Sequence, residues 1–106
     1  MVFEEAVAYC ESLDMKIILP QDDGETKDLV KLEYGQFWIA ITDSASEGNW
    51  TNIYTGEKPQ FYTKWMSGAG SDGDHAIFST VFDGFWIDVP SGSKFNTLCV
   101  KGIREL

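Results

Sequence analysis

The hydrophobic pattern of the chain centres on one short apolar run, Phe37–Thr42. Three of its six residues are β-branched, and no charge interrupts it. An apolar run of this length is typical of a strand that is buried on both faces. A polar segment containing glycine follows, and a second candidate strand begins at Trp50. The sequence therefore predicts a central strand with a second strand close behind it, followed by a turn over residues 55–59.

The segment before this run has the pattern of a helix followed by a short strand. Apolar residues recur at spacings of four, three and three, at Phe3, Val7, Cys10 and Leu13. This spacing predicts an amphipathic helix over about Val2–Leu13, with acidic residues in its first turn. The apolar run Lys16–Leu19 then predicts a short strand, which Pro20 ends.

A second helix is predicted immediately before the central strand. Asp22 is a suitable N-cap because its carboxylate can accept hydrogen bonds from the first turn, and Glu25 stands three residues later, as in a capping box. Leu29, Val30 and Leu32 give this helix a buried side, and Gly35 is a suitable stop.

The second half of the chain is predicted to contain a loop and three returning strands. Met66–Asp74 contains three glycines and no β-branched residue, so it is predicted to be a loop. Ala76–Thr80 and Trp86–Val89 are predicted to be strands on either side of an Asp-Gly turn, which is a strong hairpin signal. Phe95–Val100 is predicted to close the sheet.

Length and charge limit the classes of partner. A chain of 106 residues is expected to be one domain. Its net charge of −9 disfavours nucleic acid and anionic membranes, and favours basic partners or divalent cations. No apolar run is long enough to span a bilayer, so no direct membrane insertion is expected. Asn49 opens a glycosylation sequon, Asn-Trp-Thr, and would be available to a glycan if Trp50 is buried.

Three motifs in order resemble the C-type lectin-like domain. They are Trp-Ile-Ala-Ile-Thr-Asp at 38–43, Glu-Gly-Asn-Trp at 47–50 and Tyr-Thr-Lys-Trp at 62–65. The family writes the first motif as Trp-Ile-Gly-Leu-x-Asp. The resemblance implies an α+β fold in which two helices flank a twisted, mostly antiparallel sheet with a long loop region. It implies a single domain over residues 1–106, with almost no room here for the usual N-terminal strand.

The two cysteines are Cys10 and Cys99, and spacing alone leaves open whether they pair or stay as free buried thiols in a cytosolic protein. The resemblance implies a disulfide between the first helix and the last strand, and hence a secreted or extracellular domain. The family's second disulfide is missing, because Ala76 and Ser91 take the places of its cysteines.

The sugar-coordinating calcium site of the family is not intact. After Trp65 the chain has neither Glu-Pro-Asn nor Gln-Pro-Asp, and Ile87 replaces an asparagine ligand. Of the usual side-chain ligands, only Asp74 and Asp88 remain. Since calcium needs six to eight oxygen ligands, this site is not expected to be built in the usual way.

A second, auxiliary calcium site is a separate hypothesis. The resemblance assigns its ligands to Asp43 and Glu47, and Asp72 and Asp74 belong to the loop that would face them. Four converging carboxylates would be unfavourable without a cation. The alternative is that Asp43 ends a strand, Glu47 is solvated, and the two loop acids form turns.

The resemblance implies non-enzymatic recognition outside the cell. The expected ligand is a protein or other macromolecule bound on the long-loop side, through the Met66–Asp74 loop and the Phe82–Asp88 hairpin. The alternative is a glycan, bound with or without calcium. Candidate ligand-binding residues surround the loop: Asp72, Asp74, His75, Phe85 and Asp88. His75 is the only histidine, and the sequence places no nucleophile beside it, so an enzyme is not expected. A lone histidine beside a loop is typically a surface or hydrogen-bonding residue.

Overall fold

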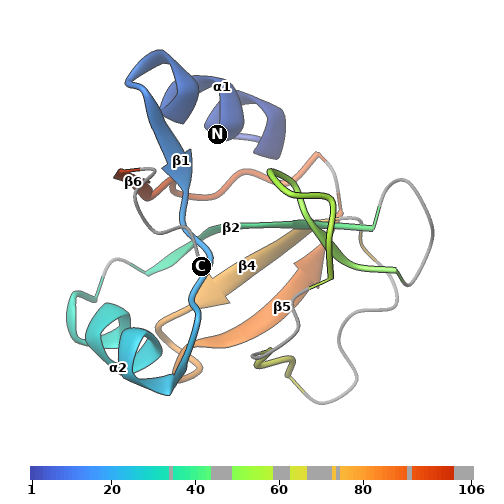
Figure 1. Ribbon diagram of the computed structural model, residues 1–106. Coiled ribbons are helices and arrows are strands. Elements are labelled where there is room, and N and C mark those ends of the chain that lie inside the picture. Colours follow the sequence, from blue (N-terminus) through green and yellow to red (C-terminus); the bar gives the residue numbers. More distant parts are fainter. Residues whose placement is uncertain are drawn as a thin grey trace.

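The structure is a computed structural model that describes residues 1–33, 35–43, 49–58, 63–66, 73, 75–90 and 92–101. Within these ranges the chain forms two helices and six strands, with both helices in the first third of the chain (Figure 1). Their bounds are α1 Phe3–Ser12, β1 Met15–Ile17, α2 Asp23–Lys31, β2 Gln36–Thr42, β3 Thr51–Asn52, β4 His75–Ser79, β5 Phe85–Val89 and β6 Cys99–Lys101. The α+β architecture predicted from the sequence is confirmed.

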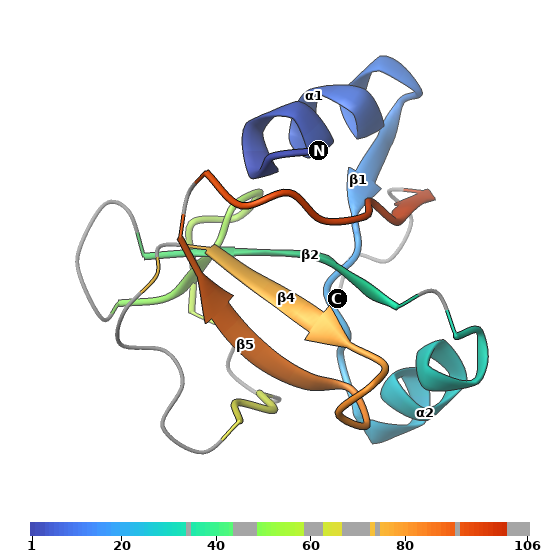
Figure 2. The same cartoon turned by 180° about the vertical axis from the view of Figure 1, so that it is seen from behind.

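The main sheet has the strand order β3-β2-β4-β5, and every neighbouring pair is antiparallel. Residues 63–66 lie along the outer side of β5, where the N–H of Trp86 donates to the carbonyl of Lys64 over 2.7 Å. The N–H of Met66 donates in turn to the carbonyl of Trp86 over 2.9 Å. Figure 2 shows β4 and β5 side by side below β2. The motif that ends at Trp65 is therefore hydrogen-bonded to β5 at Trp86.

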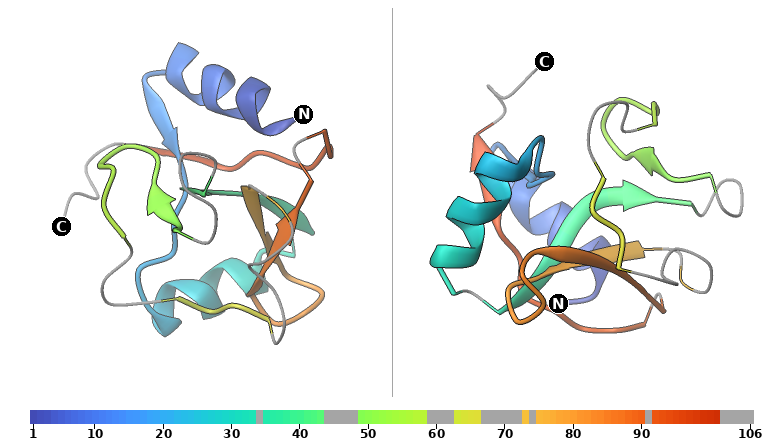
Figure 3. Two further views of the ribbon diagram at one scale, coloured as in Figure 1. Left: turned by 90° about the vertical axis from the view of Figure 1, so that its right-hand side faces the viewer. Right: turned by 90° about the horizontal axis from the view of Figure 1, so that it is seen from below.

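The central strand β2 is buried on both faces, as its sequence predicts. Phe37 and Trp38 have no exposed surface, and the next three residues are at most 1% exposed. The two helices lie on either side of the main sheet (Figures 1 and 3). The ring of Phe3 in α1 packs edge-on against Trp38 at 5.5 Å. The side chain of Thr26 in α2 lies beside Phe78 and Gly84 at the opposite face.

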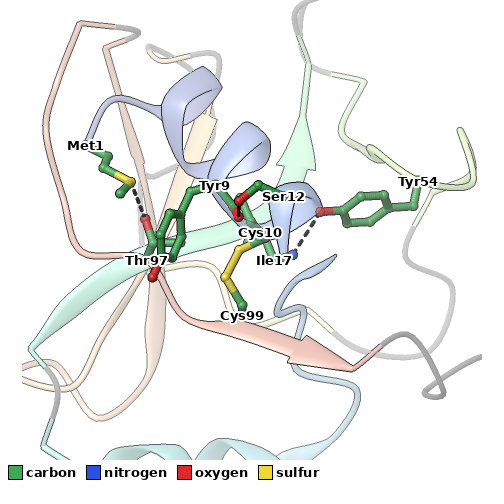
Figure 4. Close-up of a disulfide and its surroundings, with 8 residues drawn as sticks. All are labelled: Met1, Tyr9, Cys10, Ser12, Ile17, Tyr54, Thr97 and Cys99. Carbon is green, nitrogen blue, oxygen red and sulfur yellow. Dashed lines mark hydrogen bonds between the residues drawn. A yellow bond between two sulfur atoms is a disulfide. The ribbon is translucent and has the colours of Figure 1, made fainter. Parts of the chain in front are cut away.

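The last predicted strand was wrong in its length and its partner. Only Cys99–Lys101 is a strand, and it pairs antiparallel with β1 in a separate two-stranded sheet. The preceding residues run along β2, where the N–H of Trp38 donates to the carbonyl of Asn96 over 3.1 Å. The disulfide between Cys10 and Cys99 joins α1 to β6 (Figure 4). Hydrophobic pattern identifies an extended segment but does not identify its partner strand.

The N-cap of α2 is the one predicted. The Asp22 carboxylate accepts a hydrogen bond from the N–H of Glu25 over 2.8 Å, and the Glu25 carboxylate accepts one from the N–H of Gln21. The predicted helix end at Gly35 is wrong, because it lies beyond the observed end of α2. The helix ends at Lys31, and Glu33 adopts a left-handed φ of 53° two residues later.

Replacing this cap is expected to destabilise the domain modestly. Asp22→Ala removes the acceptor for the Glu25 N–H, and we expect it to lower the free energy of unfolding by about 1 kcal/mol. Urea unfolding of the variant beside Asp23→Ala tests this, because Asp23 is acidic and in the same first turn but is not the cap. An equal loss in both variants would contradict a specific role for the cap.

The hairpin between β4 and β5 is the predicted Asp-Gly turn. Asp83 and Gly84 have φ values of 59° and 81°, and the N–H of Gly84 donates to the carbonyl of Ser79 over 2.7 Å. A Cβ atom on Gly84 would lie 2.4 Å from the Cγ2 atom of Thr26, so the turn also needs glycine for its packing against α2. The turn thus ties the far end of the hairpin to the second helix.

Tyr54, in the turn after β3, holds that turn against β1. Its hydroxyl accepts a hydrogen bond from the N–H of Ile17 over 2.8 Å (Figure 4). Burial raises the pKa of Tyr54 above 10.0, the Glu11 carboxylate raises it further, and the hydrogen bond from Ile17 opposes both. The folded state therefore favours the neutral form of the Tyr54 phenol.

Tyr54→Phe is expected to lower the free energy of unfolding by about 1–2 kcal/mol, because the N–H of Ile17 loses its acceptor. The pKa of the folded state is raised, so the stability contributed by the neutral phenol is full below about pH 10 and is lost as the pH rises through the folded pKa. Urea unfolding between pH 8 and pH 11 measures both effects. A wild-type stability that falls no faster with pH than that of the variant would contradict this assignment.

No helix among the described residues combines the length and the apolar character that crossing a bilayer requires.

Candidate functional site

The candidate site lies where β2 ends and β4 begins, beside the last residues of β5. Thr42 pairs with His75, and His75 pairs with Val89. Ala76 pairs with Asp88 one step further along the same two strands. Since neighbouring residues in a strand point to opposite faces, His75 and Asp88 belong to different faces of the sheet. Of the five predicted ligand-binding residues, Asp72 and Asp74 lie outside the described part of the chain, and His75 and Asp88 lie on different faces of the sheet.

Asp88 holds the end of the long loop. Its carboxylate accepts a hydrogen bond from the N–H of Gly73 over 2.7 Å. A Cβ atom at position 73 would lie 2.3 Å from the carbonyl oxygen of Val89 and 2.6 Å from its nitrogen. Gly73 therefore packs directly on the backbone of β5, and only glycine fits there. The sequence showed Asp88 as a candidate ligand, but this backbone contact could not be predicted from it.

His75 is buried, which excludes the surface position and leaves the other predicted alternative, a histidine with a polar partner. Its imidazole stacks on the ring of Phe3 with centroids 4.1 Å apart and planes at 10°. Its Nε2 atom lies 3.4 Å from a carboxylate oxygen of Glu4, which is itself exposed. The side chain faces α1 rather than the long loop. Phe3 and Glu4 are therefore neighbours of His75 that were not predicted from the sequence. Only their position in the first turn of the helix could have suggested them.

Phe85 lies at the other end of β5 from Asp88, about 10 Å away along the strand. It pairs with Ser79, next to the Asp-Gly turn, and shares a sheet face with His75 rather than with Asp88. The ammonium of Lys64 lies 5.0 Å from the centroid of its ring. Phe85 is therefore separated from the loop end of the sheet both along the strand and by face.

Three tryptophans pack together beside the first residues of β5. Trp65 meets Trp86 edge-on at 5.7 Å and Trp50 at 4.8 Å. Trp86 has no exposed surface and Trp50 is 9% exposed, so both belong to the core. The burial of Trp50 meets the condition set for the sequon, since the neighbouring Asn49 is exposed. The motif tryptophans Trp50 and Trp65 thus form one aromatic cluster with Trp86 of β5.

The calcium hypothesis has one ligand within the described residues. Asp43 is 1% exposed at the end of β2, whereas Glu47, Asp72 and Asp74 lie outside the described part of the chain. The described residues contain no group of three or more side chains that could hold a metal. One carboxylate falls far short of the six to eight oxygens that calcium takes. The calcium hypothesis therefore stays a prediction, because three of its four ligands lie outside the described residues.

Comparison with known proteins identifies the family. The family model described as Lectin C-type domain matches residues 1–101. The carbohydrate-recognition domain of human scavenger receptor C-type lectin is similar at 25% identity and a TM-score of 0.82, covering 93% of this chain and 81% of that one.

Two further solved structures share the fold. The carbohydrate-recognition domain of cow CD23, solved in the presence of a GlcNAc2Man3 oligosaccharide, is 23% identical with a TM-score of 0.78, covering 93% of this chain and 78% of that one. A calcium-independent type II antifreeze protein is 20% identical with a TM-score of 0.81, covering 93% and 77%. Together with the two-helix fold and the bridge from α1 to β6, the family match leads to one conclusion: the chain belongs to the C-type lectin domain family.

Proposed function

We propose that this domain is a non-enzymatic recognition module that binds a protein or other macromolecule through its long-loop face, meaning residues 66–74 together with Asp88. The observation that carries the proposal is the hydrogen bond from Gly73 to Asp88. Through this bond one carboxylate oxygen of a retained acid, Asp88, is occupied by the backbone of Gly73. The neighbouring Ile87 has no side-chain oxygen to offer a cation.

Fold membership leaves the class of ligand open, because the similar structures include carbohydrate-recognition domains and an antifreeze protein. Carbohydrate binding is the second candidate. It is favoured by the similarity at 25% identity to a carbohydrate-recognition domain and by the retained Asp74 and Asp88. In this alternative, those two acids and the aromatic residues near them would contact the sugar.

Two further properties are part of the proposal. We place the domain outside the cell, because a buried disulfide between α1 and β6 suits an oxidising compartment. Calcium at Asp43, Glu47, Asp72 and Asp74 is tested by calorimetric titration while the melting temperature is followed. Micromolar to millimolar binding with a rise in melting temperature would support it, since an ion bound only by the folded state stabilises that state. A titration that gives no heat and no change in melting temperature would exclude calcium at this site.

The protein-binding function is tested on an array of purified extracellular proteins. We expect at least one specific partner, and we expect its binding to be lost when residues 67–72 are replaced by a Gly-Ser segment of equal length. The matched control is the double variant Glu33→Gln/Asp83→Asn, which alters two exposed acids near the opposite end of the sheet. Partners that bind the loop replacement as well as the wild type would contradict the proposal.

A further inference from the structure

A groove separates α1 from the turn that follows β3. It has a volume of about 380 Å³, within the range of small-ligand sites. Four elements contribute its described lining residues: Phe3, Glu4, Val7 and Glu11 from α1, Thr42 at the end of β2, Ile53 and Tyr54 after β3, and His75 at the start of β4. None of these residues belongs to the long-loop face, and His75 lies on the opposite sheet face from Asp88.

The groove combines an apolar lining with two carboxylates. Val7, Ile53 and the Tyr54 ring are half-buried and provide the apolar surface. Phe3 and His75 contribute little surface, since they stack on each other and are only 5% and 6% exposed. Glu4 and Glu11 are both exposed and lie two helical turns apart on one face of α1. Their Cα atoms are separated by about 10 Å along the helix axis. A ligand in the groove would therefore meet apolar surface along its length and negative charge at two points.

The electrostatics of Tyr54 support a preference for cations. The Glu11 carboxylate is close enough to raise the pKa of Tyr54, after the larger effect of burial. The ammonium of the chain's own Lys16 lies 5.3 Å from the centroid of the Tyr54 ring. An aromatic face attracts a cation at this distance. This ring therefore already attracts one cation of the chain itself, in a domain whose net charge is −9.

We propose that this groove is a second recognition site, which binds an arginine side chain from a basic segment of a protein partner. The aliphatic stem of arginine would lie along Val7 and Ile53, since long basic side chains cover apolar surface while their charged ends stay at polar groups. The planar guanidinium would stack on the Tyr54 ring and donate hydrogen bonds to Glu4 or Glu11. A lysine would meet the same charges but would lack the stacking and the paired donors.

The probe is a capped pentapeptide with a central arginine between glycines, titrated into the isotope-labelled domain and followed by NMR. We expect shifts in the N–H signals of α1, of the Ile53–Tyr54 turn and of His75. The same peptide with glutamine at its centre is expected to bind at least tenfold more weakly. Shifts confined to the long-loop face, or equal binding of the two peptides, would overturn the proposal.

The charge contribution is measured with matched variants. Glu4→Gln/Glu11→Gln is expected to weaken arginine-peptide binding about three- to tenfold, from two exposed charge contacts. The double variant Glu33→Gln/Asp83→Asn changes net charge by the same amount away from the groove and is expected to leave affinity within twofold. Equal weakening in both would mean non-specific attraction and would overturn the site. Tighter binding of free spermidine than of the arginine peptide would overturn the assignment to a peptide side chain.

Discussion

Loss of the Cys10–Cys99 disulfide is expected to lower the free energy of unfolding by about 4–5 kcal/mol. The bridge closes a loop of 89 positions, and the stabilisation in the chain-entropy model grows with the length of the closed loop. It also joins α1 to β6, which pairs only with the short strand β1. A domain of this size is typically only 5–15 kcal/mol more stable than its unfolded chain, so the loss would be a large part of the total.

Guanidinium unfolding of the wild type with and without reductant measures this effect. The control is the double variant Cys10→Ala/Cys99→Ala. Its free energy of unfolding is expected to equal that of the reduced wild type and not to change when reductant is added. A change below about 1 kcal/mol on reduction would contradict the prediction. It would mean that burial of α1 against the sheet, through Phe3 and Ala6, is enough to hold the helix in place.

Gly73→Ala is expected to cost about 3 kcal/mol and to release the end of the long loop. The new Cβ would stand 2.3–2.6 Å from three backbone atoms of Val89, and a strand backbone inside a sheet cannot move aside as a side chain can. The displacement would also break the hydrogen bond from Gly73 to Asp88. Both stability and any ligand binding through the long-loop face should therefore fall.

The matched control for this substitution is Gly92→Ala, since a Cβ at position 92 would meet no atom within 4 Å. We expect that variant to unfold within about 0.5 kcal/mol of the wild type. A third variant, Asp88→Asn, keeps an oxygen acceptor and removes the charge, and it should be intermediate. Gly73→Ala with wild-type stability and unchanged N–H signals around Val89 would show that the close packing described for Gly73 is wrong.

The helices, strands and turns named below were predicted well because the residues that indicate each of them are close together in the sequence. The apolar run in β2, the Asp22 cap and the Asp-Gly turn each depend on residues that are close along the chain. The order of the motifs indicated the family, and the family resemblance implied the disulfide between Cys10 and Cys99, which the spacing of the cysteines alone left open.

What sequence reasoning missed depends on contacts between distant segments. The burial of His75 depends on Phe3 of α1, 72 positions earlier, and no pattern around either residue indicates the pairing. The pairing of β6 with β1 and the packing of Gly73 on Val89 are likewise set by the folded arrangement. The candidate ligand residues were near one another in sequence, but the alternation of faces along β4 and β5 separates His75 from Asp88.

A glycan array probed with the purified domain, in calcium and again in a chelator, tests most directly whether the long-loop face recognises a macromolecule other than sugar. We expect no specific glycan in either condition, because the Asp88 carboxylate accepts a hydrogen bond from Gly73 and Ile87 has no side-chain oxygen to offer a cation. Specific glycan binding that appears in calcium and disappears in the chelator, and that Asp88→Asn abolishes, would contradict it. The domain would then be a calcium-dependent lectin.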